Sequence, residues 1–343
     1  MSQTELKTNV AVVGCGYWGP NLMRNFSEHP RSSLRWLVDL NPQRLAQFQG
    51  RYPGIRTTTQ LSEALADPDL HAVAIATPVS THYYLAQQCL QAGKHVLLEK
   101  PMAETDAECR DLIGLATARR LTLMVDHTFI YTGAVRKIRD LIRAGELGEI
   151  HYFDSVRVNL GLFQHDVNVI WDLAPHDLSI MDFVLPKRPT QVAAHGARHV
   201  AGSQIENIAY ITLRFEDETL AHFHVNWLAP AKIRRIIIGG SSKMLVFDDL
   251  SPDEKIKIYD KGLRFQESDD STMRQVLAGY RTGDMSVPHI EPVEALRREA
   301  DHFLECVRTG ARPESDGESG RRVVRVLAAA QESLARNGAF IEL

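Results

Sequence analysis

The chain has 343 residues, of which 44% are hydrophobic and 24% charged; this is ordinary globular usage and excludes disordered and fibrous proteins. That length exceeds what a single hydrophobic core usually organises, so we expect two domains. The formal net charge is -4 and the basic residues are scattered, so nucleic acid is not an expected partner.

Strands and helices alternate through the first part of the chain. Apolar and β-branched runs indicate buried parallel strands at residues 9–13, 34–38, 72–76, 95–98 and 121–125. Between them, helices are predicted at residues 19–27, 42–49, 81–92 and 106–119. This alternation predicts an α/β domain with a doubly wound parallel sheet, a Rossmann domain, over residues 1–128.

The pattern changes after residue 128. A crossover helix at 134–144 is followed by longer alternating strands at 150–158, 209–215, 219–226 and 234–238. Further helices are predicted at 170–184, 293–308 and 319–337. Residues 129–343 are therefore expected to form an α+β domain with a large mixed or antiparallel open sheet. Because the second face of such a sheet needs a cover, we expect a homodimer or homotetramer formed through it.

The cysteines and the N-terminus bear on the compartment. The four cysteines lie far apart without a C-x-x-C pair, so neither a zinc site nor a disulfide framework is expected. The N-terminal residues lack the apolar segment of a signal peptide, and no run approaches the roughly 18 apolar residues of a membrane span. No spacing suggests a metal site. A cytoplasmic protein without a membrane segment is expected.

A G-x-G-x-x-G motif follows the first strand and opens the first helix; its residues are Gly14, Cys15, Gly16, Tyr17, Trp18 and Gly19. In this context the glycines permit a tight turn and close approach to a pyrophosphate at the helix N-terminus. The second strand ends at Asp39, about 20 residues further on, where a carboxylate accepts hydrogen bonds from the ribose and repels a 2′-phosphate. NAD is therefore expected rather than NADP, although Arg44 on the next helix could reach a phosphate.

Two more strands end in polar turns at the carboxyl edge of the sheet, where doubly wound folds bind ligands. We expect contacts to the cofactor from Thr77, Pro78, His82, Glu99, Lys100 and Pro101. A partly desolvated Lys100 could donate a proton or polarise a carbonyl oxygen, whereas a lysine at a strand end is otherwise simply solvated. For His82, packing at the start of its helix is an equal alternative.

Asp172 and His176 form the candidate catalytic pair of the second domain. Their i, i+4 spacing on a predicted helix places both side chains on one face, where they can hydrogen-bond or converge on one substrate hydroxyl. Because Pro175 is unfavourable in a helix interior, the helix could instead start near Asp172, with this aspartate as its N-cap and a locally satisfied histidine. Asp177 is expected to be structural.

The glycine motif, Asp39, the stretch ATPVSTHYYLAQQCLQAGKHVLLEKP and WDLAPHD together resemble the Gfo/Idh/MocA oxidoreductase family. The likeness covers nearly the whole chain, including closing helices that in the family pack back near the Rossmann domain. It implies a nicotinamide enzyme of the EC 1.1.1 type that acts on a secondary alcohol of a sugar or cyclitol. It further implies that His176 takes the hydroxyl proton, Asp172 orients it and Lys100 holds the oxygen; whether Lys100 or His176 is the base stays open.

Within the family, GYWGPNLMRNF and NLGLFQHDVNVIWDLAPHDLSIMDFVL are most similar to enzymes of nucleotide sugars, such as UDP-N-acetylglucosamine 3-dehydrogenases. Arg157, Asn159 and Asn168 are polar groups that could contact sugar hydroxyls or a diphosphate, or equally be ordinary surface residues. Many members carry a glycine-rich approach to the histidine where this chain has VIWDLAPHD. Two alternatives stay open: a dehydrogenase of inositol or free sugars, and a non-catalytic NAD-binding regulatory protein.

Overall fold

The computed structural model describes residues 7–161, 167–266 and 277–343. The chain divides into two compact units, which are described separately below. Unit 1 comprises Met1–Thr132 and Val293–Ala328, and unit 2 comprises Gly133–Pro292 and Ala329–Leu343. The predicted fold class, a Rossmann sheet followed by a mixed sheet, is confirmed.

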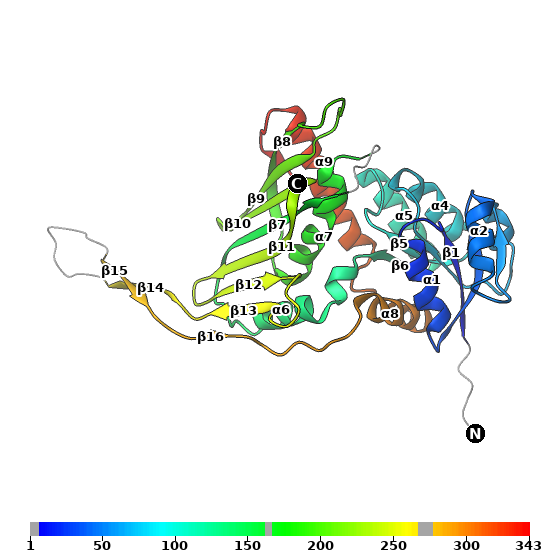
Figure 1. Ribbon diagram of the computed structural model, residues 1–343, viewed down its shortest axis with the longest axis horizontal. Helices are drawn as coiled ribbons and strands as arrows, with labels where there is room; N and C mark the ends of the chain where they lie inside the picture. Colours follow the sequence, from blue (N-terminus) through cyan, green and yellow to red (C-terminus); the bar gives the residue numbers. More distant parts are fainter. Residues whose placement is uncertain (1–6, 162–166, 267–276) are drawn as a thin grey trace, which may run out of the picture. The chain divides into compact units, whose positions relative to one another are not determined.

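Six parallel strands form the sheet of unit 1, in the order β3-β2-β1-β4-β5-β6 (Figure 1). They are β1 (Thr8–Val13), β2 (Ser32–Val38), β3 (Arg56–Thr58), β4 (Ala72–Ile75), β5 (His95–Glu99) and β6 (Leu123–Asp126). All of β4 and most of β1 are buried and apolar, as expected for strands covered on both faces. Strands β2 and β3 are added on one side of β1, and β4, β5 and β6 on the other, so the strand order reverses between β1 and β4. Doubly wound folds bind ligands at the carboxyl ends of the strands at such a point.

The helices of unit 1 have identifiable start signals. They are α1 (Gly19–Glu28), α2 (Pro42–Gln49), α3 (Leu61–Leu65), α4 (Val79–Gln91), α5 (Asp106–Arg119), the 3-10 helix η1 (Thr128–Tyr131) and α8 (Ala295–Thr309). Asn41 caps α2 by accepting from two backbone N–H groups, and Thr105 and Glu108 form a capping box on α5. These caps place both helix starts within a residue of where the sequence predicts them.

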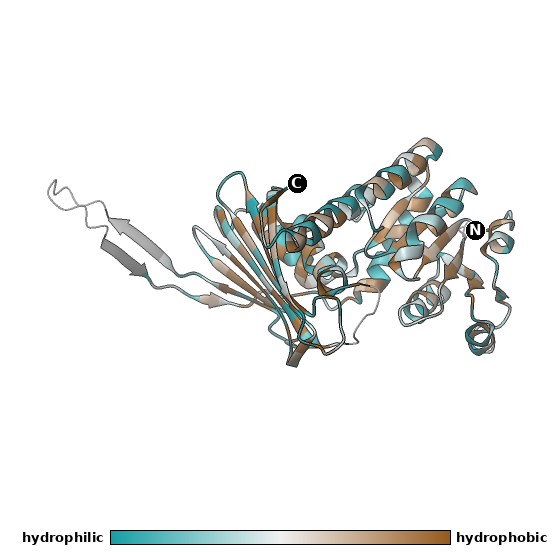
Figure 2. Ribbon diagram, turned by 90° about the horizontal axis from the view of Figure 1, so that it is seen from above, coloured by the Kyte–Doolittle hydropathy of each residue, from teal (hydrophilic) through white to brown (hydrophobic). Residues whose placement is uncertain are grey.

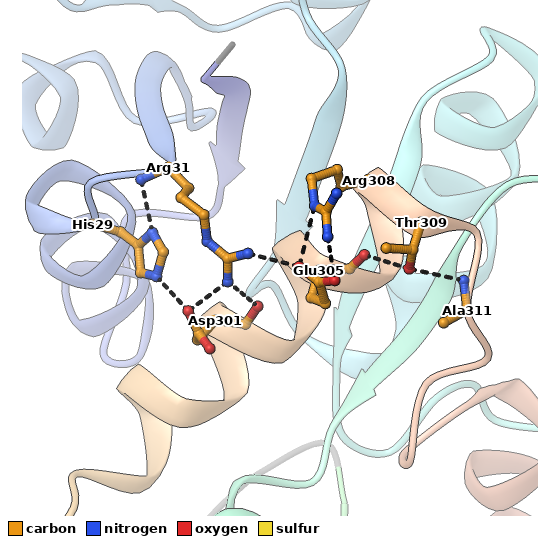
Figure 3. A network of polar contacts seen from close by, with 7 residues as sticks. All are labelled: His29, Arg31, Asp301, Glu305, Arg308, Thr309 and Ala311. Atoms are coloured by element: carbon orange, nitrogen blue, oxygen red, sulfur yellow. Dashed lines mark hydrogen bonds and ion pairs between the residues drawn. The ribbon is translucent and has the colours of Figure 1, made fainter. Parts of the chain in front are cut away.

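Helix α8 joins unit 1 although it lies late in the sequence. Figure 3 shows that Arg31 donates to Asp301 at 2.6 Å and to Glu305 at 2.7 Å, while the His29 ring lies 3.1 Å from Asp301. The rings of Phe26 and Phe303 pack edge to face with centroids 6.2 Å apart. The edge-to-face ring pair contributes about 0.5–1.5 kcal/mol beyond the area that it buries, and each ion pair to the exposed Asp301 carboxylate contributes about 1 kcal/mol or less.

Nine strands form the sheet of unit 2, in the order β16-β13-β12-β11-β7-β10-β9-β8-β17. They are β7 (Ile150–Leu160), β8 (Pro189–Ala197), β9 (Ile208–Phe215), β10 (Leu220–Asn226), β11 (Leu228–Gly240), β12 (Met244–Asp248), β13 (Ile256–Tyr259), β16 (Met285–Ser286) and β17 (Ile341–Glu342). Among the described strands of this sheet, only the pairing of β7 with β10 is parallel. A separate hairpin pairs β14 (Gly262–Gln266) with β15 (Leu277–Arg281).

One face of this sheet is covered by helices. Unit 2 contains α6 (Gly133–Arg143) and α7 (Val169–Val184), and α9 (Gly317–Ala335) continues into it from unit 1. Ala221, Phe223 and Val225 of β10 are buried on the face toward α7, whereas the residues between them are not. Figure 2 shows this alternation of apolar and polar residues along the strands, with no described helix on the other face. Among the described residues, no helix is long and apolar enough to cross a membrane.

Candidate active site

The glycine turn of unit 1 fits a dinucleotide. Gly14 has φ +95, and a Cβ there or at Gly19 would collide with a backbone carbonyl oxygen. At Gly16, by contrast, a Cβ would meet only Arg44 Nη1, at 3.9 Å. The first and third glycines therefore close the turn, and the second leaves its backbone open to a phosphate, as the motif predicts.

Asp39 is fixed beside this turn. Its Oδ2 accepts from the Cys15 backbone N–H at 2.7 Å and its Oδ1 from that of Asn41 at 2.8 Å, while Arg44 lies 3.9 Å away. Burial, and then the charge of Asp39, raise the pKa of the Cys15 thiol to about 12, so this cysteine is not a thiolate nucleophile. The arrangement fits an NAD ribose at Asp39, with Arg44 at the edge.

His82 links the two polar turns predicted to contact the cofactor. It is 1% exposed, with Nδ1 2.8 Å from Pro101 O and Nε2 2.8 Å from Thr77 O. Burial lowers the pKa of His82, and a neutral ring donates to one of the two carbonyls. The ring therefore joins the turns that follow β4 and β5, and a contact between His82 and the cofactor stays a prediction.

Two residues predicted to contact the cofactor make their hydrogen bonds within the chain. The Trp18 indole donates to Asp126 at 2.8 Å, and Glu99 accepts from the backbone N–H of Lys100 at 2.8 Å. Tyr17, between the glycines, is instead 87% exposed. Sequence reasoning missed Asp126, which closes β6 next to Glu99 on β5.

In unit 2, Asp172 lies inside the first turn of α7. The helix begins at Val169 with Asn168 as its N-cap, whose Oδ1 accepts from Ile170 and Trp171. The alternative in which the helix starts near Asp172 is therefore wrong: Asn168 caps the helix further upstream, and the helix continues past Pro175. Asp172 and His176 follow one another on one face of a continuous helix, and both are half-buried.

Trp227 holds the Asp172 carboxylate. Its indole N–H donates to Asp172 Oδ2 at 2.9 Å, and the ring is 1% exposed. The backbone N–H of Trp227 in turn donates to Asn207 O at 3.0 Å. Trp227 lies between β10 and β11, far from Asp172 in sequence, and no motif marks it, so sequence reasoning missed it.

Two of the polar residues predicted to contact substrate support α7. Arg157 donates from two nitrogens to Asp177 at 2.9 and 2.7 Å, and both side chains are buried. Asn168 donates to Glu206 and to Gln331 as well as capping the helix. Asn159 is half-buried on β7. Contacts of these three residues with substrate stay a prediction, and residues 162–166 of the motif stretch that precedes α7 lie outside the described residues.

Two family models match the chain in tandem. Residues 8–127 match the oxidoreductase family with an NAD-binding Rossmann fold, and residues 135–246 match the Gfo/Idh/MocA C-terminal domain. The chain belongs to the Gfo/Idh/MocA family. It is accordingly an NAD-dependent oxidoreductase, as the resemblance of its motifs implied.

Relatives of similar length carry more specific names. The UDP-N-acetylglucosamine 3-dehydrogenase of Acidithiobacillus ferrooxidans is 29% identical over 96% of this chain and 97% of its own. A crystal form of that enzyme has a TM-score of 0.80 at 25% identity, covering 96% of this chain and 99% of that one. The D-apiose dehydrogenase of Paraburkholderia graminis is 24% identical over 97% of this chain and 89% of its own. GenD2 from gentamicin A biosynthesis, solved with NAD, has a TM-score of 0.84 at 23% identity, covering 100% of this chain and 98% of that one.

Proposed function

We propose that this oxidoreductase transfers hydride between a secondary hydroxyl of a sugar nucleotide, at C3 of a UDP-sugar, and NAD. The observation that carries the proposal is the Asp172 carboxylate, held by Trp227 one helical turn before His176. A fixed carboxylate beside a histidine supports proton transfer at a hydroxyl. The nucleotide-sugar class is supported by the relative from Acidithiobacillus ferrooxidans, which matches over almost its whole length.

The proposed roles divide the chemistry among three side chains. His176 takes the proton of the substrate hydroxyl, and Asp172 stabilises the imidazolium that forms. The Lys100 ammonium donates a hydrogen bond to the same oxygen as its bond to carbon becomes a carbonyl. NAD, when bound, supplies the acceptor for the hydride that leaves that carbon. In the reverse direction His176 returns the proton.

Cofactor contacts are proposed for the glycine turn and the strand ends. Gly14, Gly16 and Gly19 would hold the pyrophosphate and Asp39 the adenosine ribose. Contacts are also proposed for Tyr17, Trp18, Arg44, Thr77, Pro78, His82, Glu99, Lys100 and Pro101.

The proposal is tested by following NADH formation with a panel of UDP-sugars, free hexoses and inositols. Lys100→Met should lower kcat by more than about 100-fold, since the charge that stabilises the oxygen is lost. Lys261→Met is the matched control, because Lys261 is exposed on unit 2. Turnover of free polyols alone would mean that the substrate is a free polyol and not a sugar nucleotide. NAD binding without turnover of any compound would favour a regulatory protein.

We also propose that a second copy covers the open face of the unit 2 sheet, giving a cytoplasmic homodimer or homotetramer. Tyr210 is 45% exposed there and stacks on His224 at 4.5 Å, and Leu220 is 48% exposed. Exposed apolar groups on a continuous sheet favour association. Tyr210→Glu should halve the mass measured by light scattering, whereas a wild-type protein of monomer mass would contradict the proposal.

A further inference from the structure

Three carboxylic side chains meet behind the turn that carries Lys100. Glu99 ends β5 and pairs in register with Asp126 at the end of β6. The charges of both carboxyls act on Glu299 of α8, which is 0% exposed. All three belong to unit 1, and no role proposed above uses Asp126 or Glu299.

Hydrogen-bond donors are distributed unevenly among the three carboxyls, and Glu99 accepts one, from the backbone N–H of Lys100. Asp126 accepts from the Trp18 indole through Oδ2 and from the Thr128 hydroxyl through Oδ1. Neither side-chain oxygen of the buried Glu299 has a hydrogen-bond partner among the described residues. The Thr128 hydroxyl acts on Glu299 as well, but it donates its single proton to Asp126 Oδ1. A buried carboxylate with no donor is strongly disfavoured, whereas a protonated acid in the same place can donate its O–H.

The electrostatics agree with this distribution of donors. Burial, and then the charge of Asp126, raise the pKa of Glu99 well above its ordinary value, and the same two causes raise the pKa of Glu299. Neighbouring carboxyls cannot all ionise in a site that excludes water, so protons stay on those with the fewest donors. The other groups that act on the cluster are Lys100, whose charge opposes the rise at Glu99, and Tyr131 of η1, which faces Glu299.

We propose that Glu99, Asp126 and Glu299 form a proton-sharing carboxyl cluster in which both glutamic acids donate to Asp126. The cluster positions the Lys100 turn relative to the glycine turn. Trp18 connects the cluster to the glycine turn, directly before α1. The Glu99 contact to the Lys100 backbone N–H connects it to the other turn. Its effect on turnover rests on the proposed function; its protonation and its effect on NAD binding do not.

The first test follows stability against pH. Because the folded state keeps protons that unfolded glutamates release, wild-type stability should decrease as pH rises above about 5. Glu299→Gln removes one such proton and keeps a donor to Asp126. The ratio of the variant's folding equilibrium constant to that of wild type should rise with pH by up to roughly tenfold per pH unit. The rise should end where the pH reaches the pKa of Glu299 in the folded protein.

A control on the same helix makes this test specific. Glu305 has a pKa lowered by its ion pairs with Arg308 and Arg31, so Glu305→Gln should show no such rise with pH above about 5. If the Glu299→Gln difference is equally flat, Glu299 is ionised in the folded protein and the proposal is overturned.

The second test concerns positioning. Glu299→Ala deletes the donor and should weaken NAD binding severalfold, measured by titration without substrate, whereas Glu299→Gln should restore it. Wild-type NAD affinity in folded Glu299→Ala would overturn the positioning role. Weakened NAD binding in Glu299→Ala, together with no turnover of any sugar nucleotide by wild type, would instead count against the proposed function alone.

Discussion

At the scale of single residues, the hydrogen bond from the Trp227 indole to Asp172 Oδ2 holds this carboxylate in one orientation. Trp227→Phe keeps the buried ring but removes the donor. A hydrogen bond to a charged group is worth about 1.5–3 kcal/mol, so kcat should fall roughly ten- to a hundredfold with little change in KM. Trp36→Phe is a matched control, because Trp36 donates to Asp67 in unit 1. An unchanged kcat in Trp227→Phe would contradict this role.

Asp39 and Arg44 should set the choice of cofactor. Asp39→Ala removes the carboxylate that repels a 2′-phosphate and leaves the guanidinium of Arg44, which lies 3.9 Å from it. The ratio of NAD to NADP affinity should therefore fall by at least about tenfold, as measured by fluorescence titration of both dinucleotides. A variant that still prefers NAD as strongly as wild type would mean that other contacts exclude the phosphate.

The sequence was informative about residues with a fixed spacing. Gly14, Gly16 and Gly19 could be found because a single short turn needs all three. Trp227 and Glu299 could not, since each reaches its partner only after distant segments have packed together. For Arg157, chemistry alone left a substrate contact and an ordinary surface position open. The structure instead buries its side chain against Asp177.

At the scale of elements, capping and periodicity explain which boundaries could be predicted. Helix α5 was predicted at its observed bounds because Thr105 and Glu108 form a capping box. The short strands β3, β16 and β17 have two or three residues each, too few to show a period. Strand β8 was also missed, since its run of small residues around Ala193 lacks large β-forming side chains.

The buried pair of Arg157 and Asp177 anchors α7 on β7. Asp177→Asn leaves the guanidinium buried without its counter-charge and should destabilise the protein by about 3–5 kcal/mol, measured by urea unfolding. Replacing both partners, Arg157→Met with Asp177→Leu, should recover most of that loss because no unpaired charge stays inside. A double variant as unstable as the single one would show that the pair itself, beyond charge compensation, holds the helix.

At the scale of the whole molecule, the cofactor should stabilise the fold by mass action. A ligand that binds only the folded state adds about 2.7 kcal/mol at a concentration of 100 times its Kd. NAD should therefore raise the Tm more than an equal concentration of NADP. Equal shifts with both dinucleotides would contradict the assignment of Asp39 to the ribose.

In the proposed reaction, a nucleotide-sugar hydroxyl is oxidised and His176 accepts its proton. The most direct test is NADH formation from NAD and UDP-N-acetylglucosamine by wild type, His176→Asn and His151→Asn, where His151 is an exposed histidine of the same unit. We predict turnover by wild type and His151→Asn, and a loss of more than about 100-fold in His176→Asn. Wild-type rates in His176→Asn would contradict the claim.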